Sequence, residues 1–215
     1  MKLHYQGKYN LDPETLPKRK HQPNAVKFKE VSSSKELAVI ANTIGLVLMV
    51  ILSIPILLVY KNDLLLYFDY VMLAVVFPIL TMFPHELLHA LCFKEDVYLY
   101  TNFKQGMVFV LGTETMSKKR FIFMSLLPNL VFGFLPYCLS FLGTKYLMFA
   151  LWGVIAVAMG AGDYYNVFNA LTQMPKGART YLYQMNSYWY ILKINKNKFQ
   201  KINLFYFTFF CNSFS

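Results

Sequence analysis

Four long apolar stretches run through the sequence, separated by short polar segments. The stretches cover roughly residues 37–60, 66–93, 121–143 and 146–172. A helix needs about 20 apolar residues to cross a hydrocarbon core of ~30 Å, and each stretch is long enough to do so. The pattern therefore predicts an all-α integral membrane protein with four transmembrane helices.

The segment between the second and third stretches has a different pattern. Val97–Phe103 and Met107–Leu111 are rich in β-forming residues, and they enclose Lys104, Gln105 and Gly106. Two such runs around a glycine-containing turn predict a short β-hairpin. The pattern leaves open whether this hairpin only caps the helices or offers an exposed edge to an extended peptide.

The two ends of the chain predict tails. Residues 1–36 hold three prolines among lysines, without an apolar period that could build a core. We expect them to form a basic cytoplasmic tail that is mobile or lies on a surface, and not a cleaved signal peptide. Residues 173–215 are aromatic and basic, which predicts a cytoplasmic or interfacial tail. Residues 37–172 form the expected four-helix core.

Composition and charge agree with a membrane protein. The 215 residues are 56% hydrophobic and 15% charged, with a formal net charge of +10. Of the Lys and Arg residues, all but Lys61 and Lys145 fall on the side of the membrane that holds both ends. The positive-inside rule therefore predicts a multi-pass protein of the cell membrane with both termini in the cytoplasm. This distribution favours contact with the lipid bilayer over nucleic-acid binding, which we exclude.

The strongest chemical signal is the sequence His-Glu-Leu-Leu-His near the inner end of the second stretch. His85 and His89 are four residues apart, so on a helix both imidazoles lie on one face and can bind a single zinc ion. Glu86 lies between them as a candidate general base. Cys92 lies on the same face, but a buried thiol that packs as a small apolar group is the favoured interpretation.

A catalytic zinc takes three protein ligands, so the two histidines need a partner. The position six residues beyond the motif, where many zincins have a third histidine, is Glu95 here, which we expect to be solvated with Asp96. His85 lies about 19 residues into the second stretch and Asp163 about 17 into the fourth, so both are roughly 26–28 Å from the outer surface. Asp163 is therefore the predicted third ligand, because an unpaired carboxylate at this depth is costly.

The predicted chemistry is peptide hydrolysis by a metal-activated water molecule, with Glu86 as general base. Asn129 and Asn166 are candidate contacts to the substrate or the oxyanion, and Asn166 lies one turn after Asp163. A structural role in holding a neighbouring helix is the alternative for Asn129, and it is the one we favour.

These motifs resemble a bacterial family known as "putative zincin peptidase", a domain of unknown function. The resemblance rests on HELLH in a transmembrane helix, a proline-containing third span and the sequence GAGDYYNVFNALTQMPKGA, and it covers roughly residues 37–190. The layout is similar to that of the site-2 intramembrane metalloproteases. It implies that His85, His89 and Asp163 bind zinc and that Glu86 is the catalytic base. In site-2 proteases the ligand usually stands in an Asp-Gly pair, whereas here glycine precedes Asp163.

The sequence thus predicts a zinc-dependent membrane metalloprotease that cleaves a peptide or membrane-protein segment in or near the membrane. Two other classes stay open. The first is a non-enzymatic binding or immunity protein in which zinc is a structural clamp. The second is a metal transporter that uses the same ligands. The substrate and the oligomeric state are beyond the sequence.

Overall fold

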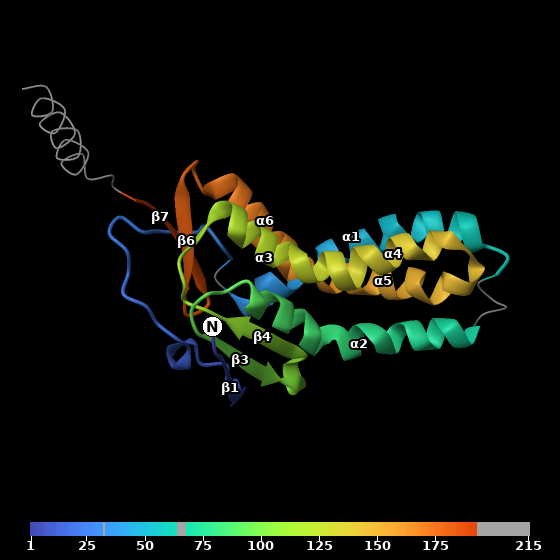
Figure 1. The fold of residues 1–215 in the computed structure, drawn as a ribbon, viewed down its shortest axis with the longest axis horizontal. Coiled ribbons are helices and arrows are strands. Elements are labelled where there is room, and N and C mark those ends of the chain that lie inside the picture. The colour runs from blue at the N-terminus through green and yellow to red at the C-terminus, as the bar shows by residue number, and fades with distance from the viewer. Residues whose placement is uncertain (32, 64–67, 193–215) are drawn as a thin grey trace, which may run out of the picture.

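A computed structural model of the protein describes residues 1–31, 33–63 and 68–192. The molecule is elongated: long helices run side by side through one half, and two small β-sheets lie at the other end (Figure 1). The last part of the predicted C-terminal tail, residues 193–215, and the start of the second predicted span lie outside the described residues.

The helices form the longer half of the molecule. Helix α1 begins after Ser33, whose hydroxyl accepts a hydrogen bond from the N–H of Glu36 and so caps the first turn. The helices are α1 (Ser34–Tyr60), α2 (Phe68–Leu91), α3 (Lys118–Asn129), α4 (Leu135–Leu139), α5 (Leu147–Met159) and α6 (Ala161–Gln173). A π-helical turn, Leu130–Phe134, joins α3 to α4, and short 3₁₀ turns lie at Pro13–Thr15, Phe103–Gln105, Ser140–Leu142 and Thr144–Tyr146.

The prediction of four transmembrane helices is only partly met. Three described helical segments are long and apolar enough to cross a membrane: Lys35–Tyr60, Met72–Leu91 and Lys118–Leu142. The fourth predicted span is a pair of helices, α5 and α6, bent by 51° between Met159 and Ala161. The count reaches four if this bent pair is one broken span.

The prediction of an all-α fold is wrong, because the described residues include seven strands in two sheets. The three-stranded sheet has the order β1 (Leu3–Lys8), β3 (Val97–Asn102), β4 (Met107–Leu111). The four-stranded sheet has the order β2 (Val26–Lys27), β7 (Asn186–Ile191), β6 (Ala178–Tyr183), β5 (Met116–Ser117). Both sheets therefore take strands from the segments predicted to be tails.

The predicted hairpin is present, as strands β3 and β4. The strands pair antiparallel, from Tyr98 opposite Leu111 to Asn102 opposite Met107. Gly106 ends the turn with φ 63°, a left-handed conformation that glycine adopts at no steric cost. Strand β1 pairs with the other edge of β3, which leaves β4 as an edge strand in the described part of the chain. That edge lies beside α2.

The largest core cluster of the described residues lies where the helices meet the sheets. It includes Ala90 and Phe93 at the end of α2, Met124 of α3, and Ala170 and Met174 at the end of α6. These side chains are buried and join three helices that are distant in sequence. The core thus fixes the C-terminal half of α2, which carries the HELLH motif, against α3 and α6.

Candidate metal centre

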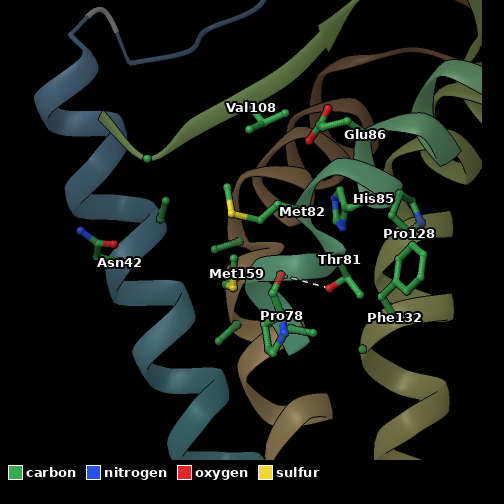
Figure 2. A pocket seen from close by; sticks show the side chains of 16 residues that line it. Asn42, Pro78, Thr81, Met82, His85, Glu86, Val108, Pro128, Phe132 and Met159 are labelled. Carbon is green, nitrogen blue, oxygen red and sulfur yellow. Dashed lines mark hydrogen bonds between the residues drawn. The ribbon is translucent and has the colours of Figure 1, made fainter. Parts of the chain in front are cut away.

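The two histidines of the motif lie on one face of α2, as the spacing predicts. The ring centroids of His85 and His89 are 4.9 Å apart. His89 is buried and His85 is half-buried, between α2 and the helices that pack on it. The side chain of His85 points into a cavity beside the helix (Figure 2).

The structure brings Asp163 to both histidines. Its Oδ2 lies 3.2 Å from Nε2 of His85, and its Oδ1 lies 3.3 Å from Nε2 of His89. Asp163 stands in the first turn of α6, just after the bend between α5 and α6. We expected a straight fourth span, whereas here the span bends by 51° just before Asp163 and α6 packs mainly on α3. The proximity of the three side chains is observed, and their role as ligands stays a prediction.

This arrangement fits a zinc ion. Zinc binds imidazole nitrogen at about 2.0–2.1 Å and carboxylate oxygen at about 2.0–2.2 Å, usually with tetrahedral geometry. Two ligand atoms on such a tetrahedron are then roughly 3.3–3.5 Å apart. The observed separations of 3.2 and 3.3 Å between carboxylate oxygens and ring nitrogens are close to this value. The donor set, two imidazoles and one carboxylate, is also one that catalytic zinc uses.

The neighbouring hydrogen bonds orient these side chains for a metal. Nδ1 of His89 lies 2.9 Å from the carbonyl oxygen of Met124, and an N–H at Nδ1 leaves Nε2 free as a ligand. Nδ2 of Asn129 donates to Oδ2 of Asp163 at 2.8 Å. The structure thus places Asn129, a candidate substrate contact, on the carboxylate of the predicted third ligand.

Glu86 lies beside the histidines and reaches toward the edge strand. The ligand atoms of His85, Glu86 and His89 lie within 4.8 Å of one another. Oε2 of Glu86 accepts a hydrogen bond of 2.9 Å from the N–H of Val110 in β4. Strand β4 therefore fixes the carboxylate of the predicted base next to the metal site.

Two cavities meet at this site. The larger, about 350 Å³, lies between α1, α2, α3, α5 and strand β4, and its wall includes Asn42, Met82, Phe132 and Met159 (Figure 2). The smaller, about 280 Å³, is lined by Asp163 and Asn166 among others. His85, Glu86 and Met159 line both cavities. Asn166 therefore faces the same space as the predicted ligand, and its contact with a substrate stays a prediction.

One ion pair near the site was not expected from the sequence. Glu114 binds Arg120, with Oε1 2.5 Å from Nη1, and the Arg120 guanidinium also donates to the carbonyl oxygen of Cys92, just after α2. Burial tends to raise the pKa of Glu114, but Arg120 and the N–H groups of Lys94 and Glu95 outweigh it and hold this pKa below its ordinary value. A single acid in a short polar loop gives no sequence signal for this role.

The other candidates near the motif lie outside the metal site. Glu95 pairs with Arg19, and Asp96 pairs with His4, on exposed or half-buried surface. Cys92 is half-buried beside the core cluster. Neither acid is among the groups that could share a metal ion in the described residues.

Comparison with known families agrees with this geometry. Residues 78–179 match the model of the family described as "Putative zincin peptidase". The resemblance predicted from the motifs is thus confirmed over a segment that holds His85, Glu86, His89 and Asp163. The family description supports a metallopeptidase and implies zinc. A search of curated proteins and a search of solved structures each found no match.

Proposed function

We propose that the chain is a membrane-embedded zinc metallopeptidase that hydrolyses a peptide bond in or near the bilayer. The observation that carries this proposal is the convergence of His85, His89 and Asp163, with Glu86 held beside them by strand β4. These are the groups needed for a zinc site with three ligands and a general base.

Each residue of the site has a separate role in the proposed hydrolysis. Zinc, when bound by His85, His89 and Asp163, acidifies water and polarises the carbonyl under attack. Glu86 takes a proton from the attacking water as its oxygen bonds to the carbonyl carbon, and it delivers that proton to the leaving amine nitrogen as the C–N bond breaks. Asn166 donates a hydrogen bond to the oxygen on which negative charge develops.

The edge of β4 is the proposed holder of the peptide. The N–H of Val110 points away from β3, since it donates to Glu86. In an antiparallel strand every second residue points its backbone groups the same way, so the N–H and C=O of Val108 also face outward. Val108 lines the larger cavity, next to His85 and Glu86. An extended peptide that pairs with this edge brings a side chain into the cavity and its backbone to the site.

The location in the membrane follows from the apolar helices and the charges. The described candidate spans carry exposed apolar side chains such as Leu58 and Leu80, which are 73% and 65% exposed and suit contact with lipid. The basic residues gather at the sheet end of the molecule, which we assign to the cytoplasm together with both termini. The metal site then lies near the cytoplasmic end of α2 and beside the first turn of α6.

One observation fits the alternative of a structural zinc clamp as well as it fits an enzyme. Glu86 joins α2 to the sheet through Val110, and such a bond would serve a non-enzymatic protein equally well. The substitution Glu86→Gln separates the two functions, because a structural clamp tolerates loss of a proton acceptor and an enzyme does not.

The experiment is Glu86→Gln in purified protein reconstituted in vesicles. We expect this variant to keep one zinc per chain, measured by atomic emission, and to lose about 10²–10⁴-fold in cleavage of fluorescently labelled casein. Glu95→Gln is the matched control, since Glu95 is exposed and makes no contact with the site. Wild-type activity in Glu86→Gln would exclude the proposed mechanism. Zinc flux across the vesicle membrane, measured in the same sample, would favour a transporter instead.

A further inference from the structure

Asn129 is buried where α3 ends, and its amide makes two hydrogen bonds. The side-chain nitrogen Nδ2 donates to the backbone oxygen of Ser125 at 3.2 Å and to Oδ2 of Asp163 at 2.8 Å. Both neighbours are acceptors, so the nitrogen and not the oxygen must face them. The two hydrogens of Nδ2 are therefore in use, which leaves none for a substrate oxyanion.

The other end of the amide packs against Gly160. The Oδ1 atom of Asn129 is buried, with no hydrogen-bond partner among the described residues. A Cβ atom on Gly160 would lie 1.7 Å from this oxygen and 2.4 Å from Cγ of Asn129. The backbone of Gly160, with φ −74°, is one that any residue adopts. Glycine is thus required at this position for space and not for conformation.

These contacts join the bend between α5 and α6 to the metal site. Gly160 stands at the bend, and Asp163 follows it by one turn of helix. The space left by the missing side chain admits the Asn129 amide, which then holds one carboxylate oxygen of Asp163. The same carboxylate faces both histidines. The orientation of the carboxylate plane therefore depends on Asn129.

We propose that Asn129 is a positioning residue for the third metal ligand, and that Gly160 supplies the gap this role requires. The inference rests on the ligand set of the proposed function. A carboxylate that binds a metal is itself usually hydrogen-bonded, and loss of such a bond typically lowers metal affinity about 10–100-fold. Asn129 acts on the metal through Asp163 and does not touch the substrate.

A double-mutant cycle tests this dependence. Zinc affinity is measured by competition with a chromophoric chelator for the full-length wild type, Asn129→Ala, Gly160→Ala and the double variant. We expect each single variant to lose about 10–100-fold in zinc affinity. Since Gly160→Ala acts by displacing Asn129, the double variant should lose no more than Asn129→Ala alone. Gly162→Ala is the matched control, because a Cβ there meets nothing within 4 Å, and its zinc affinity should equal that of the wild type.

The outcomes separate this inference from the proposed ligand set. Asp163→Ala should lose more zinc affinity than any variant of the cycle; unchanged zinc binding in that variant would refute the ligand set itself. Loss of zinc in Asp163→Ala together with wild-type affinity in Asn129→Ala would overturn only the positioning role. Losses of zinc affinity that multiply in the double variant would also overturn the positioning role. Thermal unfolding is followed for each variant to check that it folds. If Asn129→Ala does not fold, Gly160→Ala alone tests the positioning role, with the same expected loss of zinc affinity.

Discussion

Glu114 holds the C-terminal end of α2, the helix that carries the HELLH motif, and its substitution tests how firmly that end is fixed. Its Oε2 accepts the backbone N–H groups of Lys94 and Glu95, at 2.5 and 3.0 Å, and its Oε1 binds Arg120. Arg120 in turn donates through Nε and Nη2 to the carbonyl oxygen of Cys92, at 2.9 and 2.5 Å. The pair therefore ties the residues just after α2 to the start of α3.

The cost of Glu114→Gln can be estimated from burial. The Glu114 side chain is 6% exposed, and removing one partner of a buried ion pair costs about 3–5 kcal/mol. The glutamine oxygen can still accept from the backbone N–H groups, and Arg120 keeps its bonds to Cys92, so we expect roughly 3 kcal/mol. For a chain of this size, 1 kcal/mol shifts the melting temperature by about 2–4 °C. The variant should thus melt roughly 6–12 °C below the wild type.

The same change at Glu95 is the control. Glu95 also pairs with an arginine, Arg19, but it is 55% exposed, and an exposed pair contributes at most about 1 kcal/mol. Melting is followed by tryptophan fluorescence in detergent for both variants. Equal shifts for Glu114→Gln and Glu95→Gln would refute the reasoning from burial.

The Glu114 pair also predicts a dependence on pH. Because its pKa is lowered in the folded protein, its contribution to stability is present above the ordinary glutamate pKa of about 4.3 and is lost as pH falls through the lower, folded value. The melting temperature of the wild type should therefore fall more steeply below about pH 4.5 than that of Glu114→Gln. Parallel curves for the two proteins would contradict the assignment.

Two further predictions follow from the site and the sheet. Asn166→Ala should lower the rate of casein cleavage about 10²–10³-fold with zinc affinity unchanged, since in the proposed function Asn166 donates only to the developing oxyanion. Chelator competition and a rate assay on one preparation check both parts. Burial raises the pKa of Glu30, so the contribution of Glu30 to stability is present below its ordinary pKa and is lost as pH rises toward the raised one. As pH rises above the ordinary glutamate pKa of about 4.3, the melting temperature of the wild type should accordingly fall relative to that of Glu30→Gln.

The sequence predicted those features that depend on local spacing. Two histidines four apart on a helix share a face wherever the helix packs, and Gly106 between two β-forming runs predicts a hairpin turn. The grouping of Asp163 with the histidines was predicted from the cost of a carboxylate deep in a membrane, a cost that does not depend on the exact path of the helix.

The sequence did not predict features that depend on distant partners. Strand β1 is short and polar, and it forms only because β3, more than 90 residues later, pairs with it in parallel. Tyr181 and Tyr188 suited membrane anchors by composition, yet they lie opposite each other in β6 and β7, where His21 bonds to the Tyr181 hydroxyl. Gly160 lies in the run of small residues just before Asp163, and its match to Asn129 is visible only in three dimensions.

The central claim is that one zinc ion is held by His85, His89 and Asp163. An anomalous difference map, collected at the zinc absorption edge from crystals of the purified protein, tests it most directly. We predict a single strong peak about 2.0–2.2 Å from Nε2 of both histidines and from a carboxylate oxygen of Asp163. A peak bound by other residues, or one with Asp163 more than a helix diameter of about 10 Å away, would contradict it.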